Sequence, residues 1–318
     1  MIEDFILMNR NYFIFLVLLC YAFTSHSQIL DINQPLFSDL PFFNMEFVKT
    51  NKIKSITGSI SSKKVKDIIR SKGLDYSYQF NENGTLKAQF SSYLKVGLKD
   101  STLISYTYND KGKITITRKS DSYGYYSYHY SYDSLENIIL QTYCRDENKF
   151  ESKNKFELNK NYIIVSDSFS YQKLSDTQFK KIFYNGYGKI FKEQTNIYNE
   201  YGYLIEEYAK FIIGSNKQKT TYEYDEKGRL SKKHFFSNIA ENKKTTEEYS
   251  YDEIGNVLAI KYFDNDKHTS TKQFLYDQKT MLLTAQIIQE IESEFIQIIQ
   301  YNYNFFQPQE TTMKDSQN

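Results

Sequence analysis

Short stretches of alternating apolar and polar residues recur along most of this chain, and each ends in a cluster of turn-forming residues. Residues 222–230 read YEYDEKGRL, and residues 249–257 read YSYDEIGNV. Two aromatic residues two positions apart lie on the same face of a β-strand. Asp followed three positions later by Gly is typical of a type I turn, and a glycine with positive φ closes it as a bulged hairpin loop. Each unit therefore predicts a strand, a tight turn and a returning strand.

The unit repeats with a period of about 26 residues, which identifies it as an internal repeat. The glycine position is filled by Gly84, Gly112, Gly188, Gly202, Gly228 and Gly255, and Asp225 and Asp252 begin the two most regular turns. Glu136 and Thr280 stand at the glycine position of two further units, and residues 156–163 are interpreted as a weak unit. Gly188 and Gly202 are about half a period apart, which predicts one turn of this type at the opposite edge of the sheet.

Sequential hairpins predict an all-β fold, a long antiparallel meander over residues 48–306. About 16 to 20 strands are expected, and open sheets rarely exceed about ten strands without curling. We therefore expect a strongly curved or coiled sheet whose aromatic residues line the inner face. Residues 28–47 lack the repeat and are expected to form a short N-terminal cap over the first strand.

Residues 284–304 allow two interpretations. Apolar residues at 287, 288, 291, 295, 298 and 299 follow a helical period. The repeat register instead predicts a strand, a turn near residues 292–294 and a second strand. We favour the strands, because residue 304 lies one period after Thr280. Residues 307–318 are expected to be disordered.

The N-terminal segment has the features of a signal peptide. Arg10 precedes the apolar run YFIFLVLLCYAF at residues 12–23, and small or polar residues follow it. We predict a signal peptide at residues 1–27 and an exported protein, either periplasmic or at the cell surface. A lipoprotein alternative would require Cys20 at the cleavage point, but two leucines precede it where small residues are needed. No later run is long and apolar enough for a transmembrane helix in the mature chain.

Composition narrows the function classes. Forty basic and 39 acidic residues give a net charge of +1, without the basic stripe of a nucleic-acid binder. Aromatic residues make up 17% of the chain, with 30 Tyr and no Trp, and only three prolines occur, as suits a sheet. Cys144 is the one cysteine beyond the predicted signal peptide, so no intramolecular disulfide is expected there, and a buried thiol is the favoured interpretation.

The unit at residues 222–230 resembles the YD repeat of Rhs and teneurin-type proteins, and residues 249–257 are also similar to it. The similarity extends over most of residues 76–282, in the manner of short exported Bacteroidota-type members that lack a toxin domain. The resemblance implies a spiralling β-sheet. In long arrays of that family the sheet closes into a shell around a toxin domain, and other arrays serve adhesion or are labelled sugar-binding.

No catalytic motif was found, so we expect a non-enzyme without cofactors or a metal site. The histidines of the predicted mature chain, His129, His234 and His268, are far apart in sequence. Residues 264–268 could hold a cation, but they suit a turn better. Four acids are candidates for a hydrolase with carboxylates on the concave face: Glu206, Glu207, Glu247 and Glu248.

Four tyrosines form the candidate ligand-binding set. Tyr126, Tyr128, Tyr130 and Tyr132 alternate along one predicted strand and share a face. Such a row can stack on sugar rings or another flat ligand. The simpler interpretation is that these tyrosines pack against the inner-face residues of neighbouring strands, as in every repeat unit. The favoured function is a non-catalytic binding or scaffold module for an unknown envelope protein or glycan. The alternatives are an accessory or shell-like partner of a toxin or secretion system, and a hydrolase.

Overall fold

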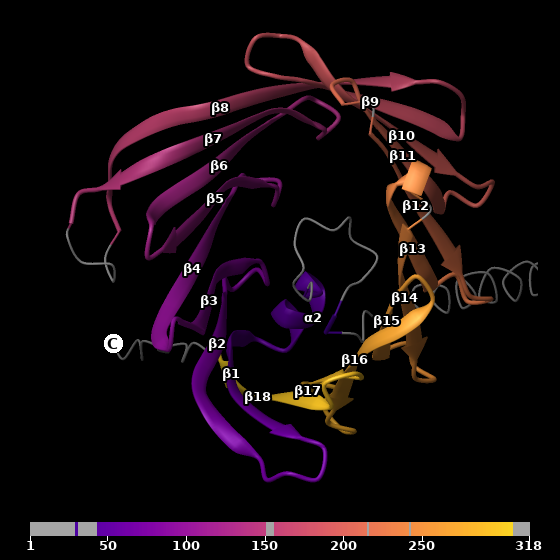
Figure 1. The fold of residues 1–318 in the computed structure, drawn as a ribbon. Helices are drawn as coiled ribbons and strands as arrows, with labels where there is room; N and C mark the ends of the chain where they lie inside the picture. The colour runs from indigo at the N-terminus through magenta and orange to yellow at the C-terminus, as the bar shows by residue number, and fades with distance from the viewer. Residues whose placement is uncertain (1–28, 31–42, 151–155, 215, 242, 308–318) are drawn as a thin grey trace, which may run out of the picture.

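A computed structural model describes residues 29–30, 43–150, 156–214, 216–241 and 243–307. The described strands form one 18-stranded antiparallel sheet in which neighbours in sequence pair. β1 (Ile53–Lys64) pairs both with β2 (Arg70–Phe80) and with β18 (Phe295–Phe305), so the sheet closes into a barrel (Figure 1). The other strands are β3 (Leu86–Lys95), β4 (Leu98–Tyr108), β5 (Ile114–Asp121), β6 (Gly124–Tyr132), β7 (Ile138–Asn148), β8 (Leu158–Lys173), β9 (Gln178–Tyr184), β10 (Ile190–Tyr198), β11 (Leu204–Phe211), β12 (Lys217–Tyr224), β13 (Leu230–Asn238), β14 (Lys243–Tyr251), β15 (Val257–Asp264), β16 (Lys267–Tyr276) and β17 (Leu283–Glu290).

This closure corrects the predicted fold class. The all-β class is right, but the open, curved or coiled meander is wrong. The first and last strands pair along their length, from Ile53 opposite Phe305 to Lys64 opposite Phe295. Closure pairs backbone groups that an open sheet would leave exposed at its two edges. The first strand therefore has no edge for an N-terminal segment to cap.

The predicted N-terminal cap instead contributes a helix inside the barrel. α2 (Met45–Thr50) lies within the ring of strands (Figure 1). The Asn44 side chain caps it by accepting hydrogen bonds from the amides of Glu46 and Phe47. Phe47 and Val48 are buried with side chains from β1, β2 and β15–β18, which form the main core: Ile53, Ile56, Ile60, Tyr78, Phe80, Val257, Ile260, Phe274, Leu283, Ile299 and Tyr301. The N-terminal segment thus fills one side of the barrel.

Strand register defines which residues face the interior. Ile56 pairs with Tyr78 on one side and with Tyr303 on the other, and directly paired residues lie on the same face. Because Ile56 packs in the core with α2, this face is the inner one. Following the pairings from strand to strand carries the inner face around the barrel.

The motif turns show why the pattern needs Asp and Gly. At the β12–β13 turn, the Gly228 amide donates to the Asp225 carbonyl at 2.9 Å, and the Asp225 side chain accepts from the amides of Lys227 and Arg229. Gly228 has a φ of +75°, a conformation in which a β-carbon is strained. The acidic side chain thus satisfies backbone donors within the turn, while glycine allows the chain to reverse.

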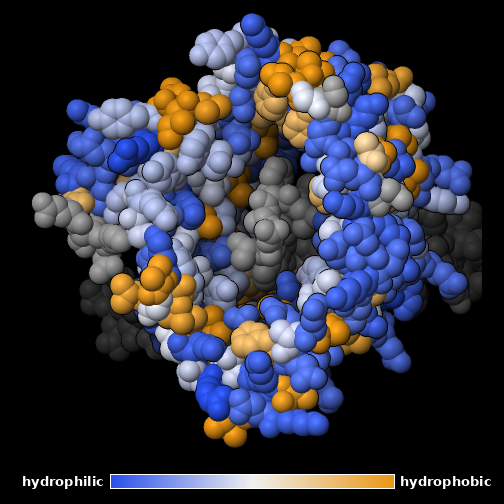
Figure 2. All heavy atoms as spheres, in the orientation of Figure 1, coloured by the Kyte–Doolittle hydropathy of each residue, from blue (hydrophilic) through white to orange (hydrophobic). Residues whose placement is uncertain are grey.

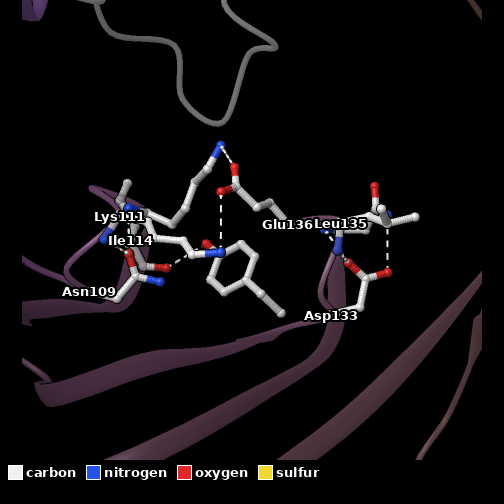
Figure 3. A network of polar contacts seen from close by, with 9 residues as sticks. Asn109, Lys111, Ile114, Asp133, Leu135 and Glu136 are labelled. Carbon is white, nitrogen blue, oxygen red and sulfur yellow. Dashed lines mark hydrogen bonds and ion pairs between the residues drawn. The ribbon is translucent and has the colours of Figure 1, made fainter.

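Glu136 occupies the glycine position of the β6–β7 turn with a φ of +66°. Its carboxylate lies 3.1 Å from Lys113 Nζ and 3.7 Å from Lys111 Nζ on the neighbouring β4–β5 turn (Figure 3). These ion pairs lower the pKa of Glu136, chiefly through Lys113. A glutamate at this position therefore links two turns that a glycine would leave unconnected.

The second aromatic of the motif has a role that the sequence pattern does not reveal. Its phenol donates to the carbonyl of the first residue of the preceding strand, as in Tyr303 to Leu283 at 2.7 Å. The backbone pairing of β17 with β18 begins only at Ala285, so this carbonyl lies beyond the end of the ladder. The same bond recurs around the barrel: Tyr108 to Leu86, Tyr132 to Ile114, Tyr171 to Ile138, Tyr224 to Leu204, Tyr251 to Leu230 and Tyr276 to Val257.

We expect Tyr303→Phe to lower the free energy of unfolding by about 1–2 kcal/mol, because a half-buried carbonyl loses its donor while the ring is retained. Urea unfolding measures the change. Tyr201→Phe is the matched control, since Tyr201 is exposed on a turn, and it should change stability by less than about 0.5 kcal/mol. Equal effects from the two variants would show that the phenol bond contributes nothing.

One predicted unit is misplaced. The sequence pattern predicts a weak hairpin unit at residues 156–163, but β8 runs through most of this stretch without a turn. The hairpin lies later, where the amide of Leu174 donates to the Gln178 carbonyl. Tyr171 makes the recurrent phenol bond for this unit. The error arose because the unit at 169–178 has no glycine to mark it.

Two other predictions about strand placement are confirmed. Residues 283–290 and 295–305 form β17 and β18, which excludes the helical interpretation. The turn at residues 185–189 joins β9 to β10, whereas the next motif turn, at 199–203, joins β10 to β11. They therefore lie at opposite ends of the barrel, as the half-period spacing predicts.

Several predictions fall on residues outside the described part of the chain. These are the signal peptide at 1–27, most of the segment 28–42 and all but the first residue of the tail at 307–318. Within the described ranges, no helix has both the length and the apolar character needed to cross a bilayer.

Candidate ligand-binding site on the inner wall of the barrel

The barrel is hollowed between its two lateral walls. Figure 2 shows this hollow in the same view as Figure 1, between the wall of β3–β7 and that of β12–β15. The main core occupies the side formed by β1, β2 and β15–β18. The candidate site is therefore the inner wall from β6 to β11, which lies away from this core.

Four tyrosines of β6 form the first part of this wall. The pairing register places Tyr126, Tyr128, Tyr130 and Tyr132 on the inner face. Tyr143 of β7 stands opposite Tyr128, with ring centroids 4.7 Å apart, and it also stacks on Tyr126 at 5.9 Å. Tyr128 remains 38% exposed, so part of its ring is free to contact a ligand.

Polar groups surround this tyrosine face. Burial raises the pKa of Tyr130 and of Tyr143, so both phenols are neutral donors at physiological pH. Lys119 of β5 pairs with Tyr126 in the register and lies 2.9 Å from Asp121. The Tyr132 hydroxyl is used in the recurrent bond to a backbone carbonyl, and the Tyr130 hydroxyl is hydrogen-bonded to the Thr117 side chain. The face therefore offers stacked rings with hydroxyls at their tips.

A second part of the wall combines lysines with phenylalanines. Lys181 of β9 lies over the rings of Phe169 and Phe183, with Nζ 4.1 and 4.9 Å from their centroids. Lys192 of β10 lies over Phe183 and Phe211 at 4.7 and 5.5 Å. Burial, together with the neighbouring charge of Lys192, lowers the pKa of Lys181 to about 8. Burial also lowers the pKa of Lys192.

A polar network continues along β10–β12. Glu207 accepts hydrogen bonds from Gln194 Nε2 at 3.1 Å and from the Tyr222 hydroxyl at 2.6 Å. Gln194 also donates to Asn196 at 3.0 Å. Burial and the Glu207 carboxylate raise the pKa of Tyr222, which keeps its phenol protonated as the donor. This network fixes the position of the carboxylate that attracts Lys192.

The four acids considered for hydrolysis face opposite sides of the wall. Glu206 and Glu248 lie on the outer face and form ion pairs with Lys219 at 2.6 Å and Lys232 at 2.8 Å. Glu207 and Glu247 lie on the inner face, where tyrosine hydroxyls donate to both. The two acids within each sequence pair are thus separated by the sheet.

Each of the three described histidines contacts a hydroxyl group. His268 Nε2 lies 2.8 Å from Thr271 Oγ1, and the other two contacts lie on the outer face. His129 Nε2 lies 3.0 Å from Ser127 Oγ, and His234 Nδ1 lies 2.8 Å from Thr246 Oγ1. Both hydroxyl residues are buried, with Ser127 fully inaccessible, so neither is presented to a substrate. Among the described residues, no group of three His, Cys, Asp or Glu side chains is arranged to hold a metal ion.

The residues at 264–268 form a hairpin turn, as favoured from the sequence. β15 ends at Asp264, β16 begins at Lys267, and the two residues between them have positive φ. Cys144 is a buried free thiol, which confirms the favoured interpretation of this residue.

Sequence analysis missed the lysine and phenylalanine cluster. Lys181 and Lys192 come from different strands and lie outside the motif, and only register places them on the same wall. The alternation in residues 179–183, where Phe179, Lys181 and Phe183 share a face, was the available signal.

Comparison with known proteins gives no family. No protein-family model and no curated protein matches the chain. Among solved structures, a porin-like protein from Bacteroides uniformis is 11% identical, with 79% of this chain and 98% of that one covered and a TM-score of 0.40. A porin-like protein from Bacteroides vulgatus is 11% identical, with 64% and 94% covered and a TM-score of 0.29. A LolA superfamily protein from Nitrosomonas europaea is 10% identical, with 83% and 92% covered and a TM-score of 0.20. These values assign neither a family nor an activity.

The identification with YD-repeat proteins of the Rhs and teneurin type is wrong. No family model supports it, and the strands close into an 18-stranded barrel, whereas the resemblance implies a spiralling sheet. The Tyr, Asp and Gly of the motif are explained locally by turn geometry and by the phenol-to-carbonyl bond. The same local chemistry can therefore arise in a sheet of different overall form.

Proposed function

We propose that this protein is an exported, non-catalytic binding barrel of the cell envelope that holds a ligand able to stack on aromatic rings, such as a glycan. The observation that supports the proposal is the tyrosine face of the inner wall, made of Tyr126, Tyr128, Tyr130 and Tyr143. Stacked rings with hydroxyl tips suit the apolar faces and hydroxyl groups of sugars. The predicted signal peptide supports the location.

The charged and hydroxyl side chains of the outer wall indicate a barrel whose outside faces water. Ion pairs such as Lys219 with Glu206 and Lys232 with Glu248 lie on it, and Ser55, Thr57 and Ser59 line the outer face of β1. A barrel that contacts lipid needs an outer apolar band, and charged side chains there are destabilising. The charges of this wall are satisfied in water, so a ligand would be held inside the barrel.

The toxin-shell alternative is not carried further, because it depended on the resemblance that the fold corrects. The hydrolase alternative is not proposed, because the two acids on the inner face, Glu207 and Glu247, each accept a hydrogen bond from a tyrosine and are accounted for as parts of the polar wall. A scaffold role without a ligand remains as an outcome of the test below.

The test is calorimetric titration of the purified protein with a panel of soluble oligosaccharides. We expect binding by at least one glycan, and an affinity at least tenfold weaker in the double variant Tyr128→Ala with Tyr143→Ala, because each ring contributes about 1 kcal/mol. Tyr201→Ala, on an exposed turn, is the matched control and should bind as the wild type does.

Two outcomes would contradict the proposal. The first is a wild-type protein that binds none of the glycans. The second is equal weakening by Tyr201→Ala and by the double variant. Circular dichroism of each variant establishes that the barrel has folded.

A further inference from the structure

Two lysines of the inner wall, Lys181 and Lys192, lie close enough for the charge of one to lower the pKa of the other. Lys181 and Lys192 make no ion pair with any described residue, whereas Lys180, which precedes Lys181 on the outer face, lies 3.7 Å from Glu193. Both inner ammonium groups are partly buried and lie against aromatic rings. Two like charges held together out of water are unfavourable unless an anion joins them.

The neighbouring groups do not supply that anion. Lys181 faces Tyr171 of β8 and Gln194 of β10 in the register, and Lys192 faces Phe183 and Phe211. Glu207 of β11 attracts Lys192, but its oxygens already accept hydrogen bonds from Gln194 and Tyr222. The described wall therefore places two positive charges beside one carboxylate, which acts on Lys192 and leaves the charge of Lys181 unmatched.

We propose that Lys181 and Lys192 form a binding site for an organic anion. Its carboxylate, or a similar group, would lie between the two ammonium groups, and its apolar body would lie against Phe183 and the exposed rings of Tyr171 and Phe179. The rings hold the ammonium groups by cation–π attraction, so the charges are positioned before the ligand arrives. This site is separate from the tyrosine face and does not depend on glycan binding there.

The aromatic surroundings select the class of anion. Phe169 is 9% exposed and forms an edge-to-face contact with Phe183 at 5.2 Å. Tyr171 and Phe179 on the same inner face are 40% and 42% exposed, so a ligand has apolar surface to contact. A small inorganic ion would use the charges and leave these rings uncovered. An aromatic or aliphatic carboxylate uses both.

The experiment compares 2-naphthoate with 2-naphthamide, which has the same ring system and no charge, by isothermal titration calorimetry on the purified protein at pH 7. We expect naphthoate to bind at least tenfold more tightly than naphthamide. Lys181→Gln and Lys192→Gln should each weaken naphthoate binding about tenfold, since charge-assisted hydrogen bonds are among the stronger polar contacts. Lys181→Arg keeps the charge and should retain most of the affinity.

Lys180→Gln is the matched control, because it removes the same charge one residue away on the other face of the sheet. It should leave naphthoate binding unchanged. Equal binding of the acid and the amide, no binding of either, or equal weakening by Lys180→Gln and Lys181→Gln would each overturn the proposal. Lys181→Gln should unfold at a temperature at least as high as the wild type, which separates lost binding from lost structure.

The pH dependence gives an independent check. Naphthoate stays ionised from pH 6 to 9.5, and the pKa of Tyr171 is raised to about 12 by burial, so it does not titrate in this range. Lys181 loses its proton as the pH rises through about 8. Affinity should be nearly constant below pH 7 and fall about tenfold in total as the pH rises through 8 to 9.5, because the loss of this charge has the same effect as Lys181→Gln. A flat profile in the wild type would overturn the proposal.

Discussion

Gly84→Ala is expected to destabilise the barrel far more than Gly112→Ala. Both glycines occupy the same motif position with similar φ angles, +86° and +76°. A β-carbon at Gly84 would lie 2.1 Å from the backbone oxygen of Met45 in α2, whereas nothing lies within 4 Å of one at Gly112. We expect a loss of about 1 kcal/mol at Gly112, from the strained φ alone, and more than about 3 kcal/mol at Gly84, where α2 must also move.

Urea unfolding followed by circular dichroism measures both variants under the same conditions. Because the local turn is shared, the difference between them isolates the packing of α2 against the β2–β3 turn. Equal losses in the two variants would show that α2 is not held at this position in solution.

Arg118→Ala is expected to cost about 3–5 kcal/mol, because it leaves a buried carboxylate without its partner. Arg118 Nε lies 2.6 Å from Asp146 Oδ2, and the Asp146 side chain is fully buried. Asn161 also donates to Asp146, and the Arg118 guanidinium lies over the Phe156 ring at 4.4 Å. The pair therefore joins β5, β7 and β8 on the outer face.

The double variant Arg118→Met with Asp146→Leu should recover much of this loss, because it removes both charges together. Lys219→Ala is the control. Its pair with Glu206 is partly exposed, so the expected cost is below about 1 kcal/mol. Thermal and urea unfolding of the three proteins provide the comparison. If Arg118→Ala lost no more stability than Lys219→Ala, the buried pair would not hold these strands together.

The hairpin turns and strand faces could be predicted from the sequence, because each depends on residues that are close together in the chain. The Asp and Gly of the motif specify the turn, and the alternation of the strands specifies which residues share a face. The prediction failed at residues 156–163, where Asn-rich sequence resembles a turn but β8 continues. There the pairing of β8 with β7 outweighs local preference.

The candidate site could be predicted only in part. Tyr126, Tyr128, Tyr130 and Tyr132 share a face by alternation within one strand. Lys181 and Lys192 meet only because β9 and β10 pair in one register, which no local pattern specifies. The role of the second motif tyrosine was also hidden, since its partner carbonyl lies on another strand about 20 residues earlier.

The sequence by itself determined the all-β class, the hairpin turns and the alternation of the strands, because turn geometry and strand period depend on neighbouring residues. Closure was decided by the tertiary structure. The pairing of β1 with β18 joins segments about 240 residues apart, and this contact, together with the core around α2, depends on the summed curvature of all the hairpins. The summed curvature of the hairpins decides whether a sheet of this length spirals or closes. Closure then brings the inner faces of all the strands around one interior.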